Sequence, residues 1–447
     1  MTPNLSPARR SLRVTTVLER LETWVTRRST VILVALTVLE VSAGVAYCLI
    51  LGDRVRYPDE QLYLDYAANL ARGHGFTLDG IHLTAFHPPG YPLLLGFLAS
   101  LGASLFVMRL LNFVLLGLTI PCGYSLLRGS HGPRAGLFAG LLILAYPVLF
   151  YTAGTFYPQT VATALLLGGL ALHGTQHPSP WTSMGAGVLL GWGVLTVPTL
   201  AFILPLLLVF DVHAWRIAWR RSLLVLVCSA ITIGFWTVRN YAVFDRFVPV
   251  STNFGINFLI GNSPATTPNN GPNADVSAYT SAAERLGLDE FDRNSYYLSQ
   301  AVAYLRSDPG HAVDLYVRKV LNYFNYRNEL RTSSESSPLR DALMLATYGP
   351  LLGLALARLA LMGRMRMSPL EGFLAMTYLL GALVSAVVFT RIRYRLPFDV
   401  LLILLVAAFL DRLWGTAISR LAGLSVSGLA GLPSSEAPAR GSAPWRG

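Results

Sequence analysis

The sequence has little charge and almost no lysine. Only 13% of its 447 residues are Asp, Glu, Lys or Arg, whereas 53% are hydrophobic. Lys319 is the only lysine, so nearly every cation is an arginine. A chain this apolar cannot bury its side chains in one water-soluble core. We therefore expect lipid to be the main solvent for most of it.

Cysteine is scarce as well. Cys48, Cys122 and Cys228 each lie within an apolar run and lack the paired spacing of a disulfide framework or a zinc site. We expect them to pack between helices. The sequence also has no repeat of fixed period and no inverted halves of the kind that many secondary transporters carry.

The formal net charge of +11 raises the question of a nucleic-acid partner. The arginines, however, form short clusters between apolar runs, and no continuous basic face with interleaved aromatics is present. This pattern excludes nucleic acid as the expected partner and favours a role for arginine in membrane topology.

Long apolar runs, by contrast, are abundant. A bilayer-spanning helix needs about 20 apolar residues, and short runs count where neighbouring helices cover them. Apolar windows occur near residues 31–51, 105–127, 134–150, 155–173, 183–196, 199–210, 221–241, 340–362, 370–390 and 396–414. Because Pro198 interrupts the backbone ladder, the fifth and sixth windows are either two half-length helices or one bent helix. The sequence predicts an all-α polytopic membrane protein of about ten or more transmembrane helices.

The arginine clusters predict the orientation of these helices. If the chain threads alternately, the amino-terminal tail, Arg128 with Arg134, and the segment from Arg358 to Arg366 share one side, which should be the cytoplasm. The first apolar run is long enough to span, and no small-x-small cleavage site follows it, so we expect an anchor. Two hydrophilic stretches, 52–104 and 242–339, then face outward.

These boundaries divide the sequence into five expected parts. They are a cytoplasmic tail (1–28), an amino-terminal membrane domain (29–241) with the first outer loop inside it (52–104), an outer-facing and partly helical region (242–339), carboxyl-terminal transmembrane helices (340–414) and a disordered tail (415–447). We expect amphipathic helices in the first outer loop.

The first outer loop opens with adjacent acids, Asp59 and Glu60, directly after Pro58. Pro58 suits the first turn of a helix, and Tyr63 falls one turn after Asp59 on the same face. The two acids complement the helix dipole, or else one of them is a general base at the boundary between water and membrane. The residues alone leave both readings open.

A proline-rich corner, "HPPGYP", follows in the same loop and contains His87 and Gly90. Its prolines restrict the backbone, while the glycine permits a tight turn. The corner is a simple helix entry, or it holds His87 beside a carboxylate where it binds a phosphate or a metal.

Further arginines occur at the outer ends of apolar runs, where positive residues should be scarce. Arg239 precedes Asn240, and Arg391, Arg393 and Arg395 lie between two spans. Either they reach towards lipid phosphates, or they bind a specific anionic headgroup or phosphodiester, which arginine grips with a planar fork. Glu40 is the one acid well inside an apolar run, and such residues usually face a partner or a cavity.

The order of these features resembles a known family. A span is followed by "PDE" and a tyrosine, then "GHGF", then "HPPGYPLLL", a later stretch containing Arg239, Asn240, Asn253 and Asn257, and finally "RYRLP". This order is similar to that of the polytopic GT-C glycosyltransferases, in the branch of the protein O-mannosyltransferases, lipid A aminoarabinose transferases and lipopolysaccharide galacturonosyltransferase-like proteins. The resemblance covers roughly residues 30–415.

The resemblance implies a sugar donor on a polyprenyl phosphate in the outer leaflet of a bacterial plasma membrane, and a lipid, glycan or protein acceptor. It implies that Asp59 is the catalytic base, with Glu60 beside it. It places the donor phosphate at His87, Arg239, Arg391, Arg393 and Arg395, and the substrate pocket at Tyr63, Tyr91, Asn240, Asn253 and Asn257. Aminoarabinose transferases have an acidic metal ligand where this chain has Phe86, so no cofactor is certain and a divalent metal stays in question.

The expected chemistry agrees with this assignment. Displacing a polyprenyl phosphate needs a base for the incoming hydroxyl and positive charge for the departing phosphate. One carboxylate suffices, unlike the opposed pair of a glycosidase, and the anomeric centre is inverted. The rival interpretation is a transporter or flippase of lipid-linked sugars that binds the same phosphate without catalysis.

Overall fold

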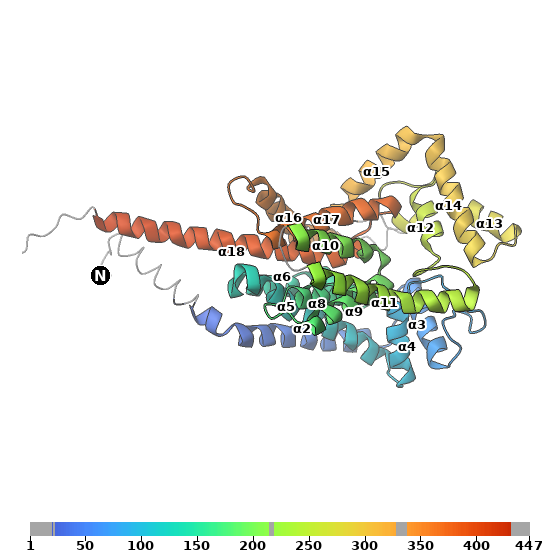
Figure 1. Ribbon diagram of the computed structural model, residues 1–447, viewed down its shortest axis with the longest axis horizontal. Helices are drawn as coiled ribbons and strands as arrows, with labels where there is room; N and C mark the ends of the chain where they lie inside the picture. Colours follow the sequence, from blue (N-terminus) through green and yellow to red (C-terminus); the bar gives the residue numbers. More distant parts are fainter. Residues whose placement is uncertain (1–19, 21–22, 214–218, 328–337, 431–447) are drawn as a thin grey trace, which may run out of the picture.

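The computed structural model describes residues 20, 23–213, 219–327 and 338–430. The chain is a long helical bundle with a second group of helices at one end (Figure 1). The bundle consists of α2 (Ser29–Leu51), α5 (Leu105–His131), α6 (Pro133–Leu144), α7 (Pro147–Ala153), α8 (Gln159–His173), α9 (Pro180–Thr196), η1 (Pro198–Phe202), α10 (Ile203–His213), α11 (Trp219–Phe244), α16 (Pro338–Ala360), α17 (Pro369–Val388) and α18 (Ile392–Ala430).

Two segments form the group at the end of the bundle, which we call the outer end. The first contributes α3 (Pro58–Ala71) and α4 (Gly90–Ser100). The second contributes α12 (Phe254–Gly261), η2 (Gly271–Asn273), α13 (Ser277–Arg285), α14 (Glu290–Ser307) and α15 (Pro309–Tyr323). They correspond to the two hydrophilic stretches that the sequence predicts to lie outside. The described residues contain no strand, only an isolated bridge between Thr77 and Leu83.

Each apolar window of the sequence coincides with helical structure. Among the described residues, five helices are long and apolar enough to cross a membrane: α2, α5, α11, α16 and α17. The pair α6 and α7, bent by 59° at Ala145 and Tyr146, makes six if it is one span. The break before Pro198 separates α9 from η1 and α10, so that pair is two short helices. The protein is a multi-pass membrane protein.

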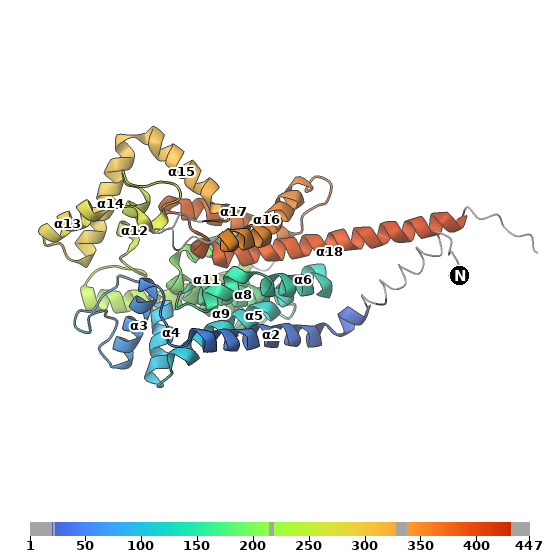
Figure 2. The ribbon, with the colours of Figure 1, turned by 180° about the vertical axis from the view of Figure 1, so that it is seen from behind.

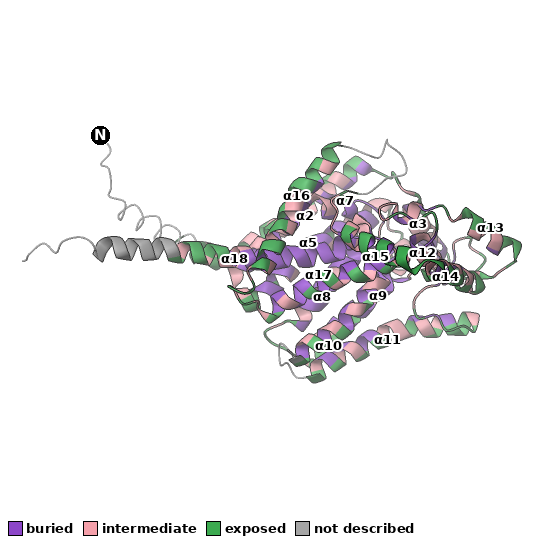
Figure 3. Ribbon diagram, turned by 90° about the horizontal axis from the view of Figure 1, so that it is seen from above, coloured by how far each residue is buried: buried purple, intermediate pink, exposed green. Residues whose placement is uncertain are grey.

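The centre of the bundle is built around the first part of α18. From Val400 to Phe409 every side chain is buried. Figure 3 shows buried residues gathered along α5, α8 and α17 around this helix. A helix that is apolar on all sides is stable only where other helices or lipid surround it. This arrangement brings the start of α18, and with it the arginine cluster, to the outer end of the bundle.

Helix α18 continues beyond the bundle to Ala430 and extends away from the outer end (Figures 1 and 2), so the first part of the expected tail from residue 415 is helical. The segment has no proline before Pro433 and contains several good helix formers, so a helix already started in the bundle propagates through it. Residues 431–447 and most of the expected tail 1–28 lie outside the described residues.

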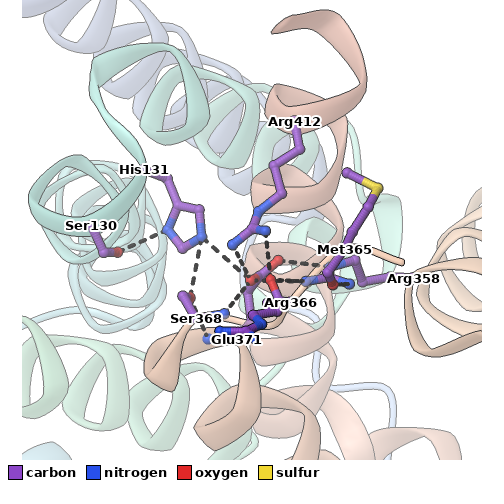
Figure 4. Close-up of polar contacts among 8 residues, drawn as sticks. All are labelled: Ser130, His131, Arg358, Met365, Arg366, Ser368, Glu371 and Arg412. Carbon is purple, nitrogen blue, oxygen red and sulfur yellow. Dashed lines mark hydrogen bonds and ion pairs between the residues drawn. The ribbon is translucent and has the colours of Figure 1, made fainter. Parts of the chain in front are cut away.

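The opposite end, which the arginine clusters predict to be cytoplasmic, has its own polar cluster (Figure 4). Glu371, at the start of α17, is fully buried and accepts hydrogen bonds from Arg358 Nε (2.8 Å), Arg412 Nη2 (2.6 Å) and the Ser368 backbone N–H (2.7 Å). His131 of α5 lies 3.7 Å from the same carboxylate. The cluster therefore joins α5, α16, α17 and α18.

Candidate active site

The first turn of α3 is anchored before its acids are placed. Arg109 of α5 donates to the backbone oxygens of Gly52 and Arg54. These two hydrogen bonds fix the end of α2 and the start of the first outer loop. Glu60 is 1% exposed, and its carboxylate accepts from the backbone N–H groups of Arg56 (3.1 Å), Tyr57 (3.1 Å) and Phe156 (2.9 Å). An acid that caps its own helix and bonds a second loop has a positioning role.

Asp59, one residue earlier, points elsewhere. Its side chain is 43% exposed, and its Oδ2 lies 2.8 Å from Nη1 of Arg393, at the start of α18. Arg393 also donates to the hydroxyl of Tyr394 (2.7 Å) and lies between the rings of Tyr157 and Tyr394, 4.8 Å from each centroid. The acid of the first outer loop and one arginine of the late cluster thus meet directly, although 334 residues separate them.

Tyr63 lies one turn after Asp59 on α3. Its ring meets Tyr91 edge-on at 5.4 Å and His87 at 6.1 Å. Burial raises the pKa of the Tyr63 phenol, and Asp59 raises it further while Arg393 opposes the shift. The phenol is therefore a neutral hydrogen-bond donor next to a carboxylate and a guanidinium.

His87 lies in the proline-rich corner, within ring contact of Tyr63 and Tyr66. Its Nδ1 is 3.2 Å from the Tyr66 hydroxyl. Burial lowers the pKa of the imidazole to about 4, and Asp59 opposes this shift. At neutral pH the ring is uncharged, so it offers one N–H donor, which differs from the cationic phosphate ligand that the resemblance implies.

Arg239 lies at the outer end of α11, and its contacts are with the protein. Its Nη1 donates to the backbone oxygen of Thr84 (3.0 Å) and to Oδ1 of Asn240 (3.0 Å), and the guanidinium lies 4.8 Å from the Trp236 ring centroid. Asn240 is fully buried and donates to the backbone oxygen of Val248 (2.9 Å). Both side chains hold the corner loop and its neighbour in place.

The other two arginines of the late cluster differ from Arg393. Arg395 is 1% exposed, pairs with Asp399 at 2.8 Å and lies 3.8 Å from the Tyr348 ring centroid. Its contacts are therefore with the protein interior, in contrast to those of Arg393. Arg391 is half-buried and packs against Gly271, where an added Cβ would lie 2.7 Å from its Nε.

The other residues that the sequence assigns to the substrate pocket, Tyr91, Asn253 and Asn257, form hydrogen bonds within the protein. Tyr91 is fully buried, and its hydroxyl accepts from Asn112 Nδ2 (3.2 Å). Asn253 accepts from Ser251 Oγ (3.0 Å), and Asn257 donates back to the Asn253 backbone oxygen (2.9 Å) at the start of α12. The Tyr91 ring packs against that of Tyr63, whereas the two asparagines stabilise the loop before α12.

Two residues that touch Arg393 were absent from the sequence prediction. Tyr394 lies inside the arginine cluster itself, where its aromatic ring beside cations was a usable signal. Tyr157 follows α7 and has no such signal, since only the folded chain brings it to Arg393.

The residues around Asp59 do not form a ready-made cluster of metal ligands. Among the residues that the structure describes, no group of three or more His, Cys, Asp or Glu side chains could hold a metal ion. Near Asp59, Glu60 is already engaged by three backbone donors. We therefore derive no step that passes through a metal.

The fold of the helical bundle can be compared with that of solved membrane proteins. Solved structures with this arrangement include the oligosaccharyltransferase AglB from Archaeoglobus fulgidus in complex with an inhibitory peptide and a dolichol-phosphate, which is 14% identical with a TM-score of 0.53 over 93% of this chain and 53% of that one. A second structure of the Archaeoglobus fulgidus oligosaccharyltransferase, tethered to an acceptor peptide, is 14% identical with a TM-score of 0.52 over 91% of this chain and 54% of that one. ArnT from Cupriavidus metallidurans, bound to undecaprenyl phosphate, is 16% identical with a TM-score of 0.40 over 88% of this chain and 78% of that one.

The likeness to the two oligosaccharyltransferase structures confirms the GT-C fold that the sequence predicts, and at this identity it shows the fold alone. The chain spans about half the length of the two oligosaccharyltransferase chains. The family model described as dolichyl-phosphate-mannose-protein mannosyltransferase matches residues 86–238, from the proline-rich corner to the outer end of α11. No curated protein matches the sequence.

Proposed function

We propose that the protein is a membrane glycosyltransferase that moves a sugar from a polyprenyl-phosphate donor to a lipid, glycan or protein acceptor at the outer face of a bacterial plasma membrane. The observation that carries the proposal is the contact of Asp59 with Arg393 at the outer end of the bundle. It joins a partly exposed carboxylate with a guanidinium of the kind that binds phosphates. The match to the mannosyltransferase model and the GT-C fold support the same activity.

The reaction is a single displacement. Asp59 accepts the proton of the acceptor hydroxyl as its oxygen forms a bond to the anomeric carbon. The bond from that carbon to the phosphate oxygen breaks, and its electron pair stays on the lipid phosphate. Arg393 stabilises the added negative charge, and Tyr63 and His87, which are in ring contact with each other, are neutral donors near enough to Asp59 for its charge to act on both.

Arg393 has to serve two anions in turn. It pairs with Asp59 and with the Tyr394 hydroxyl, and its Nε has no hydrogen-bond partner among the residues that the structure describes. When the singly charged phosphodiester of the donor takes over Arg393, the Asp59 carboxylate is free to accept a proton, and Arg393 then stabilises the second negative charge that bond cleavage leaves on the lipid phosphate. The donor therefore prepares its own base, and Glu60 keeps the turn in register through its three backbone contacts.

The outer helices from α12 to α15 are the part of the protein best placed to choose the acceptor. They cover the same end of the bundle as α3 and the start of α18 (Figure 1). We propose that this region selects the acceptor while Arg391 and Arg393 hold the donor phosphate.

The test is sugar transfer by the purified full-length protein in lipid nanodiscs, with defined polyprenyl-phosphate sugars and an extract of envelope lipids and glycans as acceptor. Asp59→Asn should reduce the transfer rate about 100-fold or more, the usual scale for losing a general base, while donor binding is retained. Asp65→Asn is the matched control, because Asp65 lies on the same helix and, within the described part of the chain, its side chain bonds only that of Gln61. It should transfer at the wild-type rate.

Two results would overturn the proposal. Equal rates for the wild type and Asp59→Asn would remove the base. Movement of the intact lipid-linked sugar across the bilayer, with no transfer to any acceptor, would make the protein a transporter.

A further inference from the structure

Helix α15 has one apolar face that is not buried in the protein. Three of its side chains point inward and are buried: Leu315, Lys319 and Tyr323. They recur every four residues, as one face of an α-helix requires. A polar face contains Asp314 and Arg318, which form an exposed ion pair at 2.8 Å.

The third face of α15 is apolar and exposed. Val313, Val317 and Leu321 are 64%, 49% and 66% exposed. They also recur every four residues, so they form one continuous stripe between the buried face and the polar face. Single exposed apolar residues are ordinary on a protein surface, but an ordered stripe of large ones marks a contact with another apolar phase.

The depth of α15 follows from its contacts with α17, which is long and apolar enough to span the membrane. Lys319 donates to the backbone oxygen of Val388, the last residue of α17, at 3.0 Å. One turn later, the Tyr323 ring is 5.5 Å from that of Tyr378, and its hydroxyl lies 3.0 Å from where a Cβ on Gly381 would be.

At 1.5 Å per residue, the seven residues from Gly381 to Val388 place the side-chain tip of Tyr323, the last residue of α15, about 10 Å inside the outer end of α17. Figure 1 shows α15 running from α14, at the outer end, down to α17. The helix therefore passes from the outer region into the level of the membrane-spanning helices.

The stripe also adjoins an exposed apolar face of α17, a helix long and apolar enough to span the membrane. On α17, Met376, Leu379, Leu383 and Val387 are each between 41% and 45% exposed and fall on one helical face. The Tyr316 hydroxyl of α15 donates to the backbone oxygen of Leu383 at 3.0 Å, which joins the two helices at this face. The apolar surface thus continues from the spanning helix onto α15.

We propose that α15 is a membrane-embedded helix of the outer leaflet, whose stripe of Val313, Val317 and Leu321 contacts phospholipid acyl chains while Asp314 and Arg318 lie among the headgroups. The proposal stands whether or not the protein is a glycosyltransferase. It attaches the region from α12 to α15 to the membrane surface. It also explains why a buried lysine, Lys319, holds the turn between α17 and α18: that turn and α15 share one depth in the leaflet.

The test uses single cysteines in the full-length protein, with Cys48, Cys122 and Cys228 replaced by alanine. A polarity-sensitive nitrobenzoxadiazole probe is attached at Val317→Cys and, as the matched control on the next residue, at Arg318→Cys. Each protein is reconstituted in phosphatidylcholine vesicles with or without lipids that carry a nitroxide on the acyl chain. Unchanged gel-filtration profiles show that the variants are folded.

We expect the probe at residue 317 to emit at shorter wavelength than the probe at residue 318 and to lose at least half of its intensity to the acyl-chain nitroxide, while aqueous iodide quenches the probe at residue 318 several-fold more strongly. A probe at Leu321→Cys should be quenched more by a nitroxide deep in the chain than a probe at Val313→Cys. Equal iodide quenching at 317 and 318 would overturn the proposal. So would a 317 probe that neither quencher reaches, because a second protein chain would then cover the stripe.

Discussion

Arg393 and Arg395 have opposite environments because α18 is a helix. Two residues apart, their side chains are turned by about 200°, so only one of them can face the outer site. Arg393 faces Asp59, whereas Arg395 faces inward to Asp399 and the Tyr348 ring. The same substitution at the two positions should therefore have different consequences.

Arg393→Lys keeps the positive charge but loses the planar fork and the stacking between the rings of Tyr157 and Tyr394. We expect the KM for the polyprenyl-phosphate donor to rise about 10-fold, the equivalent of roughly 1.4 kcal/mol, with little change in thermal stability. The measurement is initial transfer rates over a range of donor concentrations, beside a thermal unfolding curve.

Arg395→Lys is the comparison. It leaves Asp399 buried with a poorer partner, so we expect it to lower the unfolding temperature while the KM of the folded enzyme stays near the wild-type value. If Arg395→Lys raised the KM and Arg393→Lys did not, the assignment of the phosphate ligand to Arg393 would be wrong.

His87 makes stability depend on pH. Its folded pKa of about 4 is below the ordinary value of 6.5, so the unfolded chain binds more protons than the folded one between these two values. The stabilising difference is fully present above pH 6.5 and is lost as the pH falls towards 4. Between pH 7 and pH 5 the loss should be roughly 2 kcal/mol.

The measurement is the change in unfolding free energy between pH 7 and pH 5 for the wild type and for His87→Gln, which cannot titrate. We expect the variant to lose less stability on acidification by about that amount. Identical pH profiles for the two proteins would show that His87 is not held as a neutral ring.

At the scale of elements, the proline-rich corner is held by α14 from the outer region. Glu290, in the first turn of α14, accepts hydrogen bonds from Thr84 Oγ1 (2.5 Å), the Ala85 backbone N–H (3.0 Å) and Thr252 Oγ1 (2.5 Å). Thr252 also donates its backbone N–H to Ala85 (2.9 Å). These contacts tie the loop that contains His87 to the helices proposed to select the acceptor.

Glu290→Gln should destabilise the protein by about 1–3 kcal/mol, because a neutral amide replaces a carboxylate that accepts three hydrogen bonds and the charge-assisted part of these bonds is lost. Thermal unfolding measures the loss. Glu284→Gln on α13, an exposed position, is the matched control and should change stability little. Equal effects of the two substitutions would mean that Glu290 does not hold the corner.

The start of α4 tests the same corner from its other side. A Cβ at Gly90 would lie 2.3 Å from Thr196 Oγ1 and 2.8 Å from the Thr196 backbone nitrogen, and backbone cannot move aside cheaply. We expect Gly90→Ala to cost about 1–3 kcal/mol of stability. Gly234→Ala, in the middle of α11 with nothing within 4 Å, should instead stabilise by roughly 0.5–1 kcal/mol. A stable Gly90→Ala protein would show that α4 and α9 pack less closely than described.

The helices could be predicted from the sequence because their length and apolar character are local properties. The windows near 31–51 and 105–127 begin and end within a few residues of α2 and α5. Even α3 was predictable, because Pro58 and the two acids mark its first turn. What the pattern could not separate was the role of each acid: Glu60 is the helix cap and Asp59 the exposed carboxylate, a choice made by which side chain meets the backbone of Phe156.

At the scale of the whole molecule, the site depends on pairings that no local pattern specifies. The Asp59–Arg393 contact joins the first outer loop to the last helix, and Tyr157 comes from a third segment. Resemblance to a family assigned Asp59 to catalysis and gave Arg239, Arg391, Arg393 and Arg395 the same role at the phosphate, because arginines at outer helix ends look alike in a sequence. Their environments differ only after α11 and α18 are packed: Arg239 meets Thr84 and Trp236, and Arg395 meets Asp399.

The opposite end of the bundle decides whether these helices stay aligned. Glu371 and Arg358 are both fully buried there, and Arg412 of α18 closes the cluster on its exposed side (Figure 4). Removing one partner of a buried pair leaves the other charge uncompensated, which costs about 3–5 kcal/mol, whereas replacing both by apolar residues is often neutral. Arg358→Met should therefore lower the unfolding temperature strongly, and Arg358→Met with Glu371→Leu should recover most of the loss.

The measurement combines thermal unfolding in nanodiscs with the transfer rate per folded molecule. Because the cluster is at the end of the bundle away from Asp59, we expect the folded fraction of Arg358→Met to keep the wild-type KM for donor. Arg340→Met is the control: its pair with Asp341 is partly exposed and 3.8 Å apart, so its loss should cost less than about 1 kcal/mol. If Arg358→Met unfolded at the same temperature as Arg340→Met, the buried cluster would not be what holds α16, α17 and α18 together. If the double variant lost as much stability as the two single changes added, Glu371 and Arg358 would act independently.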